Sequence, residues 1–318
     1  MILFLAAIVK KIVNKTFHPT SRGHILATSK RSAIEKYVAS ASAMIMPIIN
    51  NKYVLFLFVT SIVHNFNQRP NTVQFLNEKF MNPVETTYQG SVAIITMKNG
   101  ENRHNPAFAK AMLEALKKVE LNSESKALII TSDDEKSFSL GIDTEWLMPA
   151  MKTQKFDEIK GFMRDMDDVF KRLLLFPMPV IAAINGHAFG NGAILTCACD
   201  FRFMLADKGF FCFPEVDLSI PFLPGMIEFV KKAIPYHRFN EMKLSGRRVS
   251  GRELENDNVI EKAYDSKELL MEGALNYAQT FDKKRAIFGE HKKRLHKHII
   301  DTIDTQNKPL IASLSLMV

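Results

Sequence analysis

Residues 177–201 read PMPVIAAINGHAFGNGAILTCACDF and contain a strand, a turn and a helix in immediate succession. The apolar run 180–184 has the length of a buried strand and follows two prolines that end the preceding helical pattern. A glycine-rich turn over 186–192 leads into a short apolar helix over 192–199, and a further strand is predicted over 201–205. This succession predicts an α/β fold.

The sequence on both sides continues the alternation of strands and helices. Upstream, the pattern predicts strands over 91–97 and 126–131, a helix that begins at Pro106, and a long amphipathic helix over 156–173. After Pro235 the chain is predicted to be mostly helical, at 241–244, 252–256, 267–280 and about 283–305. We therefore divide it into an N-terminal extension (1–84), an α/β core (85–250) and a C-terminal helical subdomain (251–318).

Composition and charge narrow the class of protein. The 318 residues are 47% hydrophobic and 24% charged, as in a globular protein. The net charge of +8 lies entirely in residues 1–84, which contain ten basic and two acidic residues, so the rest of the chain is neutral. A neutral main domain argues against a groove for phosphate backbones, and we predict no nucleic-acid partner. The three cysteines fit neither a disulfide framework nor a zinc site, so we expect reduced thiols, no metal and a cytoplasmic location.

Residues 1–84 leave three interpretations open. Their basic, acid-poor composition resembles an organelle transit peptide, which would place the protein in mitochondria. The apolar runs 1–9 and 53–63 are each too short to span a bilayer, although the first could give weak membrane association. The third interpretation, which we favour, is that Met81 is the true start of the protein.

Three segments carry groups suited to chemistry. The turn 186–192 and a second glycine-centred turn, 136–143, each present backbone amides where a strand ends. Two such amides directed at one carbonyl oxygen would stabilise an enolate. Glu215 stands among apolar residues over 210–218, which disfavour its charged form, raise its pKa and suit it to proton transfer. Taken singly, each segment also fits an ordinary tight turn or a solvated carboxylate.

Together and in this order, the three segments resemble the crotonase (enoyl-CoA hydratase/isomerase) superfamily. The most specific match is 177–188 followed by CDFR at 199–202, and LSGR at 244–247 with REL at 252–254 resembles a later family motif. The resemblance covers about residues 88–264. It implies a spiral of ββα units whose C-terminal helices assemble a homotrimer or a dimer of trimers. It also implies an acyl-CoA thioester as substrate, with coenzyme A present only as part of that substrate.

The resemblance assigns the candidate site. The two oxyanion donors would be the backbone amides of Ile142 and Asn191, and Glu215 would be the catalytic acid and base. Contacts to the acyl group or to coenzyme A would come from Arg103, Phe138, Leu140, Gly141, Gly190 and Phe222. Glu145 stands where some relatives carry a lysine near the nucleotide phosphate, so Arg103 or His104 is the candidate for that contact.

The carboxylates decide which reaction the resemblance implies. Hydratases of the family use two glutamates, but the first of these positions is Ile194 here and only Glu215 matches the second. A single carboxyl suits removal of a proton from C2 and its return to C4, which is Δ3,Δ2-enoyl-CoA isomerisation. PEVDL at 214–218 and YDS at 264–266 resemble the monofunctional isomerases of plant type. The alternatives are hydration or thioester hydrolysis of an acyl-CoA, and a non-catalytic acyl-CoA-binding scaffold.

Overall fold

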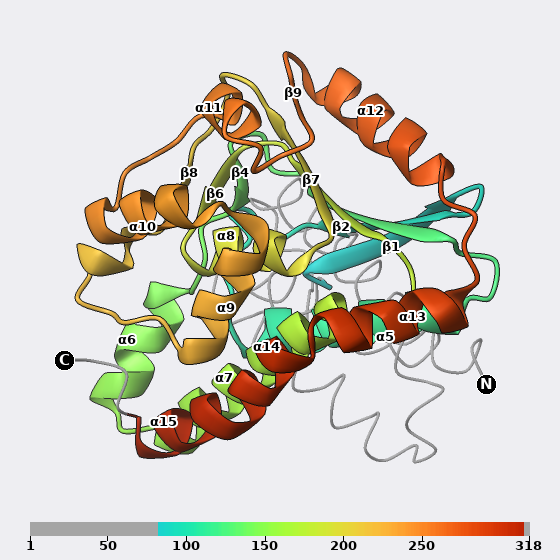
Figure 1. Ribbon diagram of the computed structural model, residues 1–318. Helices are drawn as coiled ribbons and strands as arrows, with labels where there is room; N and C mark the ends of the chain where they lie inside the picture. The colour runs from blue at the N-terminus through green and yellow to red at the C-terminus, as the bar shows by residue number, and fades with distance from the viewer. Residues whose placement is uncertain (1–81, 315–318) are drawn as a thin grey trace, which may run out of the picture. The chain divides into compact units, whose positions relative to one another are not determined.

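The computed structural model describes residues 82–314 (Figure 1). The chain divides into two units, Met1–Met81 and Asn82–Val318, and only the second is described below. The three interpretations of the N-terminal extension therefore concern residues that lie almost wholly outside the described part. Within residues 82–314, no helix is both long and apolar enough to cross a membrane.

The main sheet has six strands in the order β1-β2-β3-β5-β7-β9. The first two form an antiparallel hairpin, and every later neighbour pairs in parallel. The strands are β1 (Val84–Gln89), β2 (Val92–Met97), β3 (Ala127–Ser132), β5 (Val180–Ile184), β7 (Phe201–Leu205) and β9 (Lys262–Tyr264). Strand β1 was not predicted, because its outward-facing residues are polar and exposed and it has only one strongly buried position.

A second, three-stranded parallel sheet in the order β4-β6-β8 carries the site. Its strands are β4 (Ser137–Ser139), β6 (His187–Phe189) and β8 (Phe211–Cys212), and each follows one strand of the main sheet along the chain. Helices complete each turn of the chain: α6 (Thr144–Lys152) and α7 (Phe156–Leu174), then α8 (Asn191–Ala198), then α9 (Pro224–Ala233). Three successive units thus place one strand in each sheet, which confirms the spiral of ββα units expected from the sequence.

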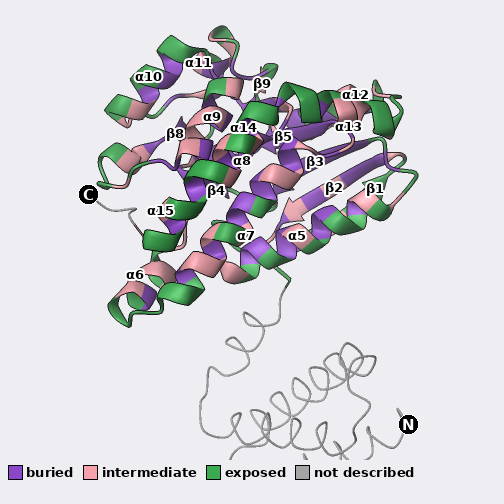
Figure 2. Ribbon diagram, turned by 60° about the horizontal axis from the view of Figure 1, so that its bottom comes forward, coloured by how far each residue is buried: buried purple, intermediate pink, exposed green. Residues whose placement is uncertain are grey.

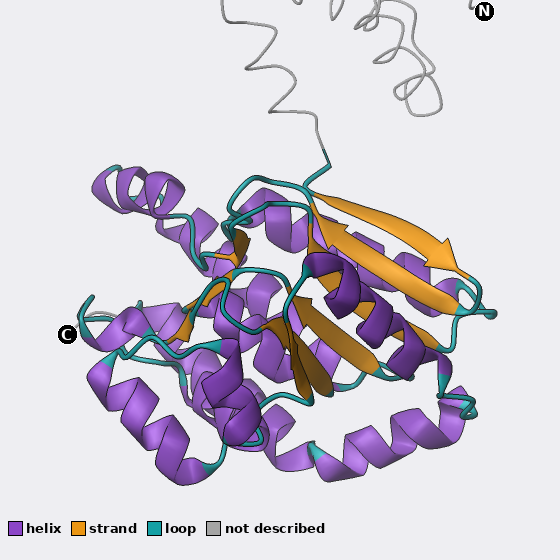
Figure 3. Ribbon diagram, turned by 90° about the horizontal axis from the view of Figure 1, so that it is seen from above, coloured by secondary structure: helices purple, strands orange, loops and turns teal. Residues whose placement is uncertain are grey.

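Helices cover both faces of the main sheet, as Figure 3 shows from above. Leu128 and Ile130 of β3 face the core that contains α5 (Pro106–Leu121), α7 and α8. Ile129 faces the opposite side, where α12 (Lys267–Gln279) packs on the sheet. Because both faces are covered, all six residues of β3 are buried, which explains why its first four residues are all apolar. The burial of the central strands between exposed helix faces is visible in Figure 2.

The C-terminal region is more broken than the sequence pattern predicts. It contains α10 (Tyr236–Ser245), α11 (Gly251–Asn256), α13 (Arg285–Leu295), α14 (Lys297–Thr302), the π-helical turn η2 (Ile303–Asn307) and α15 (Lys308–Ser313). The single helix expected over about 283–305 is wrong, because the backbone at His296 (φ −106, ψ 11) leaves helical geometry between α13 and α14. The predicted C-terminal helical subdomain also supplies β9 to the main sheet and α12 to its outer face.

Candidate active site

The two glycine-centred turns lie in direct contact. Gly141 has φ +80, and a Cβ placed on it would lie 2.7 Å from the carbonyl oxygen of Phe189 and 3.0 Å from the backbone nitrogen of Asn191. Only glycine allows this approach at this backbone angle. Helix α8 therefore begins against the end of the first turn, although about fifty residues separate the two segments.

Among residues 82–314, neither expected donor amide gives its N–H to a protein acceptor. Gly141 O accepts from His104 N at 2.7 Å, and Asp143 N donates to His104 O at 2.9 Å. In this parallel bridge the intervening N–H of Ile142 points away from His104. Asn191 is the first residue of α8, so its N–H has no acceptor within the helix. The structure thus brings together the two amides that the resemblance assigns to an oxyanion hole.

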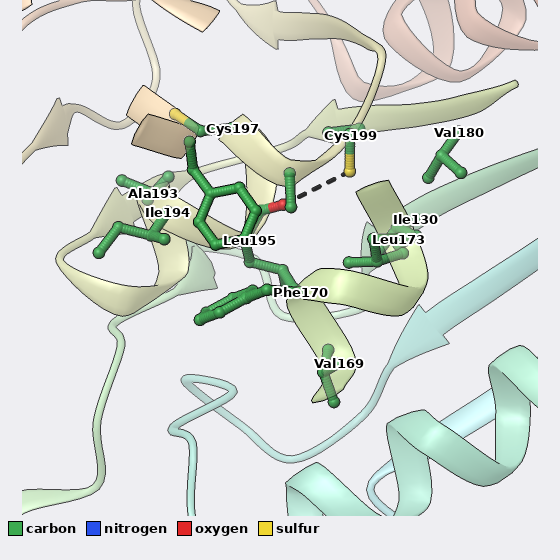
Figure 4. Close-up of a cluster of buried hydrophobic side chains, with 14 of the residues drawn as sticks. Ile130, Val169, Phe170, Leu173, Val180, Ala193, Ile194, Leu195, Cys197 and Cys199 are labelled. Atoms are coloured by element: carbon green, nitrogen blue, oxygen red, sulfur yellow. Dashed lines mark hydrogen bonds between the residues drawn. The ribbon is translucent and has the colours of Figure 1, made fainter. Parts of the chain in front are cut away.

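Helix α8 is buried on all sides, which holds its N-terminus in place. Every residue from Asn191 to Ala198 is buried. Figure 4 shows its apolar side chains among those of α7, with the Cys199 thiol directed at the carbonyl of Leu195 at 3.5 Å. Ile194, which the resemblance places at the position of the first hydratase glutamate, is 1% exposed and packs in this core. A carboxylate at this position would be buried in the apolar core.

The Glu215 side chain lies close to the N-terminus of α8, although the residue belongs to another segment. It occupies the short 3-10 helix η1 (Pro214–Val216), which follows β8. A Cβ placed on Gly190 would lie 2.9 Å from Oε1 of Glu215, so the carboxyl group rests against the residue that precedes Asn191. Its other oxygen, Oε2, is buried and has no hydrogen-bond partner among residues 82–314.

Burial sets the acidity of this carboxyl group. It raises the pKa of Glu215 from 4.5 to about 7, and the Lys243 ammonium partly offsets the effect. Lys243 comes from α10 and lies 4.0 Å from the centroid of the Phe222 ring. Phe222 is 8% exposed and packs edge-on against Phe213, with ring centroids 5.5 Å apart. An acid with this pKa exchanges its proton readily near neutral pH.

The other residues predicted to contact the acyl group or coenzyme A differ in how far they are buried. Leu140 is half-buried within the first turn, and Arg103 is half-buried in an ion pair with Glu101 at 2.8 Å. Phe138 exposes none of its surface and packs in the main core, which favours a structural role over a contact with substrate. His104 is also fully buried, so the suggestion that it contacts a CoA phosphate is wrong.

The sequence analysis did not identify Ser139 or Lys243 as residues of this site. It named His104 only as a possible contact to coenzyme A and did not predict its structural role. Ser139 and His104 join the two turns through buried hydrogen bonds. Lys243 reaches the surroundings of Glu215 from a helix that begins twenty-one residues later along the chain. No local pattern indicates any of these contacts, because each depends on how distant segments pack together.

Comparison with known proteins shows the family to which the chain belongs. The family model "Enoyl-CoA hydratase/isomerase" matches residues 87–311. The chain belongs to this family. The fold described above is the crotonase fold, which solved members of this family share.

Individual family members differ in reaction and location. The chain is 26% identical to the peroxisomal enoyl-CoA delta isomerase 2 of Arabidopsis thaliana, over 69% of this chain and 95% of the relative. It is 27% identical to the mitochondrial Delta(3,5)-Delta(2,4)-dienoyl-CoA isomerase of Homo sapiens, over 59% and 60%. A solved enoyl-CoA hydratase of Mycobacterium ulcerans superposes with a TM-score of 0.65 at 22% identity, over 73% and 98%. The cytoplasmic location expected from the cysteines stays a prediction, since these two curated relatives are named for organelles.

Proposed function

We propose that the protein is a Δ3,Δ2-enoyl-CoA isomerase in which Glu215 is the only proton-transfer group. The observation that carries the proposal is the position of one buried carboxyl group beside the first residue of α8, with Ile194 one turn further along. A family reaction that needs two carboxylates has no second one at that position. The two free amides and the raised pKa of Glu215 are what an enolate-forming reaction requires.

The proposed reaction begins with Glu215 as a carboxylate. It removes a proton from C2 of the 3-enoyl thioester, and the electrons of the C2–H bond move toward the thioester oxygen. The resulting dienolate oxygen accepts hydrogen bonds from the amides of Ile142 and Asn191. Glu215, now protonated, gives the proton to C4. The C3–C4 double bond is lost, a C2–C3 double bond forms, and the carboxylate is regenerated with no net change in atoms or electrons.

The charge that develops on the thioester oxygen explains why backbone amides suit this site. The N-terminus of α8 carries a partial positive charge, and its first N–H has no acceptor within the helix. Removal of one such donor in other enzymes costs about 3–4 kcal/mol of transition-state stabilisation. Because the donors belong to the main chain, the identities Ile and Asn do not interfere with them.

Incubation of the purified protein with a 3-enoyl-CoA tests the proposal. We expect a conjugated 2-enoyl-CoA product that accumulates, with little further conversion to a 3-hydroxyacyl-CoA. Glu215→Gln should lose turnover while it retains the fold and binds substrate. Rapid hydration of added 2-enoyl-CoA would instead identify a hydratase, release of free coenzyme A would identify a thioesterase, and binding without conversion would leave a scaffold.

We also propose that the protein binds acyl-CoA as a homotrimer or a dimer of trimers, as the family resemblance implies. Arg103 is the candidate for the CoA phosphate, and it would exchange its present partner, Glu101, for the nucleotide. Arg103→Met should raise KM for an acyl-CoA and leave kcat close to its original value. Sedimentation of the full chain gives the oligomeric state directly.

A further inference from the structure

A buried polar network joins the two turns that carry the donor amides. His104 is fully buried and stacks on Phe108, with ring centroids 4.2 Å apart. Its Nε2 lies 3.0 Å from Oγ of Ser139, and its Nδ1 lies 3.0 Å from Nδ2 of Asn191. Ser139 is 0% exposed and Asn191 is 4% exposed. Water therefore does not compete for these hydrogen bonds, which makes each of them costly to lose.

The positions of the hydrogens follow from the distances. Ser139 Oγ lies 2.7 Å from the carbonyl oxygen of Asn102, a contact that requires the hydroxyl hydrogen between the two oxygens. Ser139 must then accept from its other neighbours, the N–H of Gly141 at 3.2 Å and Nε2–H of His104. With the proton on Nε2, Nδ1 of His104 is the acceptor for the side-chain amide of Asn191.

The imidazole is therefore neutral and serves as a fixed donor and acceptor. Burial lowers the pKa of His104 to about 3, far below neutral pH. A base role for His104 is also excluded by its contacts, because both ring nitrogens are already engaged within the network. His104 belongs to the frame of the site and leaves proton transfer to Glu215.

His104 holds both donor segments at once. Its backbone N–H and carbonyl form the bridge that orients the Ile142 amide, while its ring binds the side chain of Asn191. We propose that His104 is a positioning residue that sets the separation of the Ile142 and Asn191 amides. This inference rests on the proposed function, since it concerns the grip on a developing enolate oxygen.

His104→Phe is the central test, because a phenyl ring can keep the stacking on Phe108 and loses both hydrogen bonds. We expect kcat for 3-enoyl-CoA to fall roughly tenfold to hundredfold with KM changed by less than about threefold, since small misplacement of reacting groups acts on the transition state. His104→Gln, which offers one donor and one acceptor, should recover part of the loss. His296→Phe is the matched control, because His296 is also buried (5% exposed) but lies in the C-terminal region.

A second measurement separates this inference from the isomerase proposal. A 3-ketoacyl-CoA ionises to an enolate with its own ultraviolet absorbance, and a site with two aligned amides should stabilise the enolate without turnover. We expect the wild type and His296→Phe to bind the enolate form, and His104→Phe to bind the probe mostly as the neutral ketone. Asn191→Ala keeps the backbone amide and should resemble His104→Phe, and the double variant should lose little more than either single one.

The outcomes decide between the two proposals. Enolate binding that depends on His104 in a protein without isomerase activity would support the positioning role and overturn the proposed reaction. Normal kcat and normal enolate binding in folded His104→Phe would overturn the positioning role and leave the isomerase proposal standing. A wild-type protein that neither turns over 3-enoyl-CoA nor binds the enolate would overturn both.

Discussion

Replacing Glu215 by glutamine should remove activity and stabilise the fold at alkaline pH. The buried carboxyl group holds its proton more tightly in the folded chain than in the unfolded chain, because its pKa is about 7 and not 4.5. As the pH rises from 4.5 toward 7, the unfolded chain ionises freely while the folded chain must either keep the proton or bury a charge. The free energy of unfolding of the wild type therefore falls across this interval and levels off above it.

The size of this effect follows from the same two values. At 1.36 kcal/mol per pH unit, the interval between 4.5 and about 7 corresponds to about 3 kcal/mol as an upper bound. Glutamine cannot ionise and does not incur this loss. The difference in unfolding free energy between Glu215→Gln and the wild type should thus grow by up to about 3 kcal/mol between pH 4.5 and pH 8.

Denaturant unfolding of both proteins at pH 5 and pH 8, with isomerase rates alongside, measures this difference. Glu253→Gln is a control of opposite sign. Hydrogen bonds to the Glu253 carboxylate, first from the Ser250 amide, hold its pKa below the usual range, so this substitution should become relatively more destabilising as the pH rises. A difference between Glu215→Gln and wild type that stays constant with pH would mean that the carboxyl group is solvated, and the reasoning about its burial would be refuted.

Three further expectations follow from particular contacts. Lys243→Met should move the acid limb of the pH profile of kcat/KM to higher pH by about 0.5 to 1 pH unit, because the Lys243 ammonium lowers the pKa of Glu215. Lys243→Arg should restore the original limb. A limb that stays in place in Lys243→Met would contradict the electrostatic coupling between Lys243 and Glu215. Gly190→Ala and Gly100→Ala both place a side chain at positive φ, but only the former meets Glu215, so only the former should lower kcat, by roughly a hundredfold. All three cysteine thiols are buried, with pKa raised to about 11 or 12. The rate of thiol alkylation should therefore equal the rate at which the protein unfolds. Rapid labelling of the native protein would contradict this expectation.

Much of the core could be predicted from local patterns. Strand β5 has the continuous apolar run of a fully buried strand and helix α7 has the apolar spacing of an amphipathic helix, and both were predicted within a residue of their observed bounds. Helix α9 was not predicted, although Pro224 stands at its first position. Strands of two or three residues, such as β8, leave no periodicity for a pattern to detect.

Local sequence patterns were enough to predict the central strands β2, β3, β5 and β7, the long helix α7, the two glycine-centred turns, and one glutamate among aromatic residues. Each of these follows from residue type and spacing within a short window. Tertiary structure alone decided that the Glu215 carboxyl rests on Gly190, that Gly141 touches the first residue of α8, and that His104 joins the two turns. These contacts join segments from about twenty-five to ninety residues apart. They form because burial of α8 and the sheet brings the segments together, and no local preference encodes that approach.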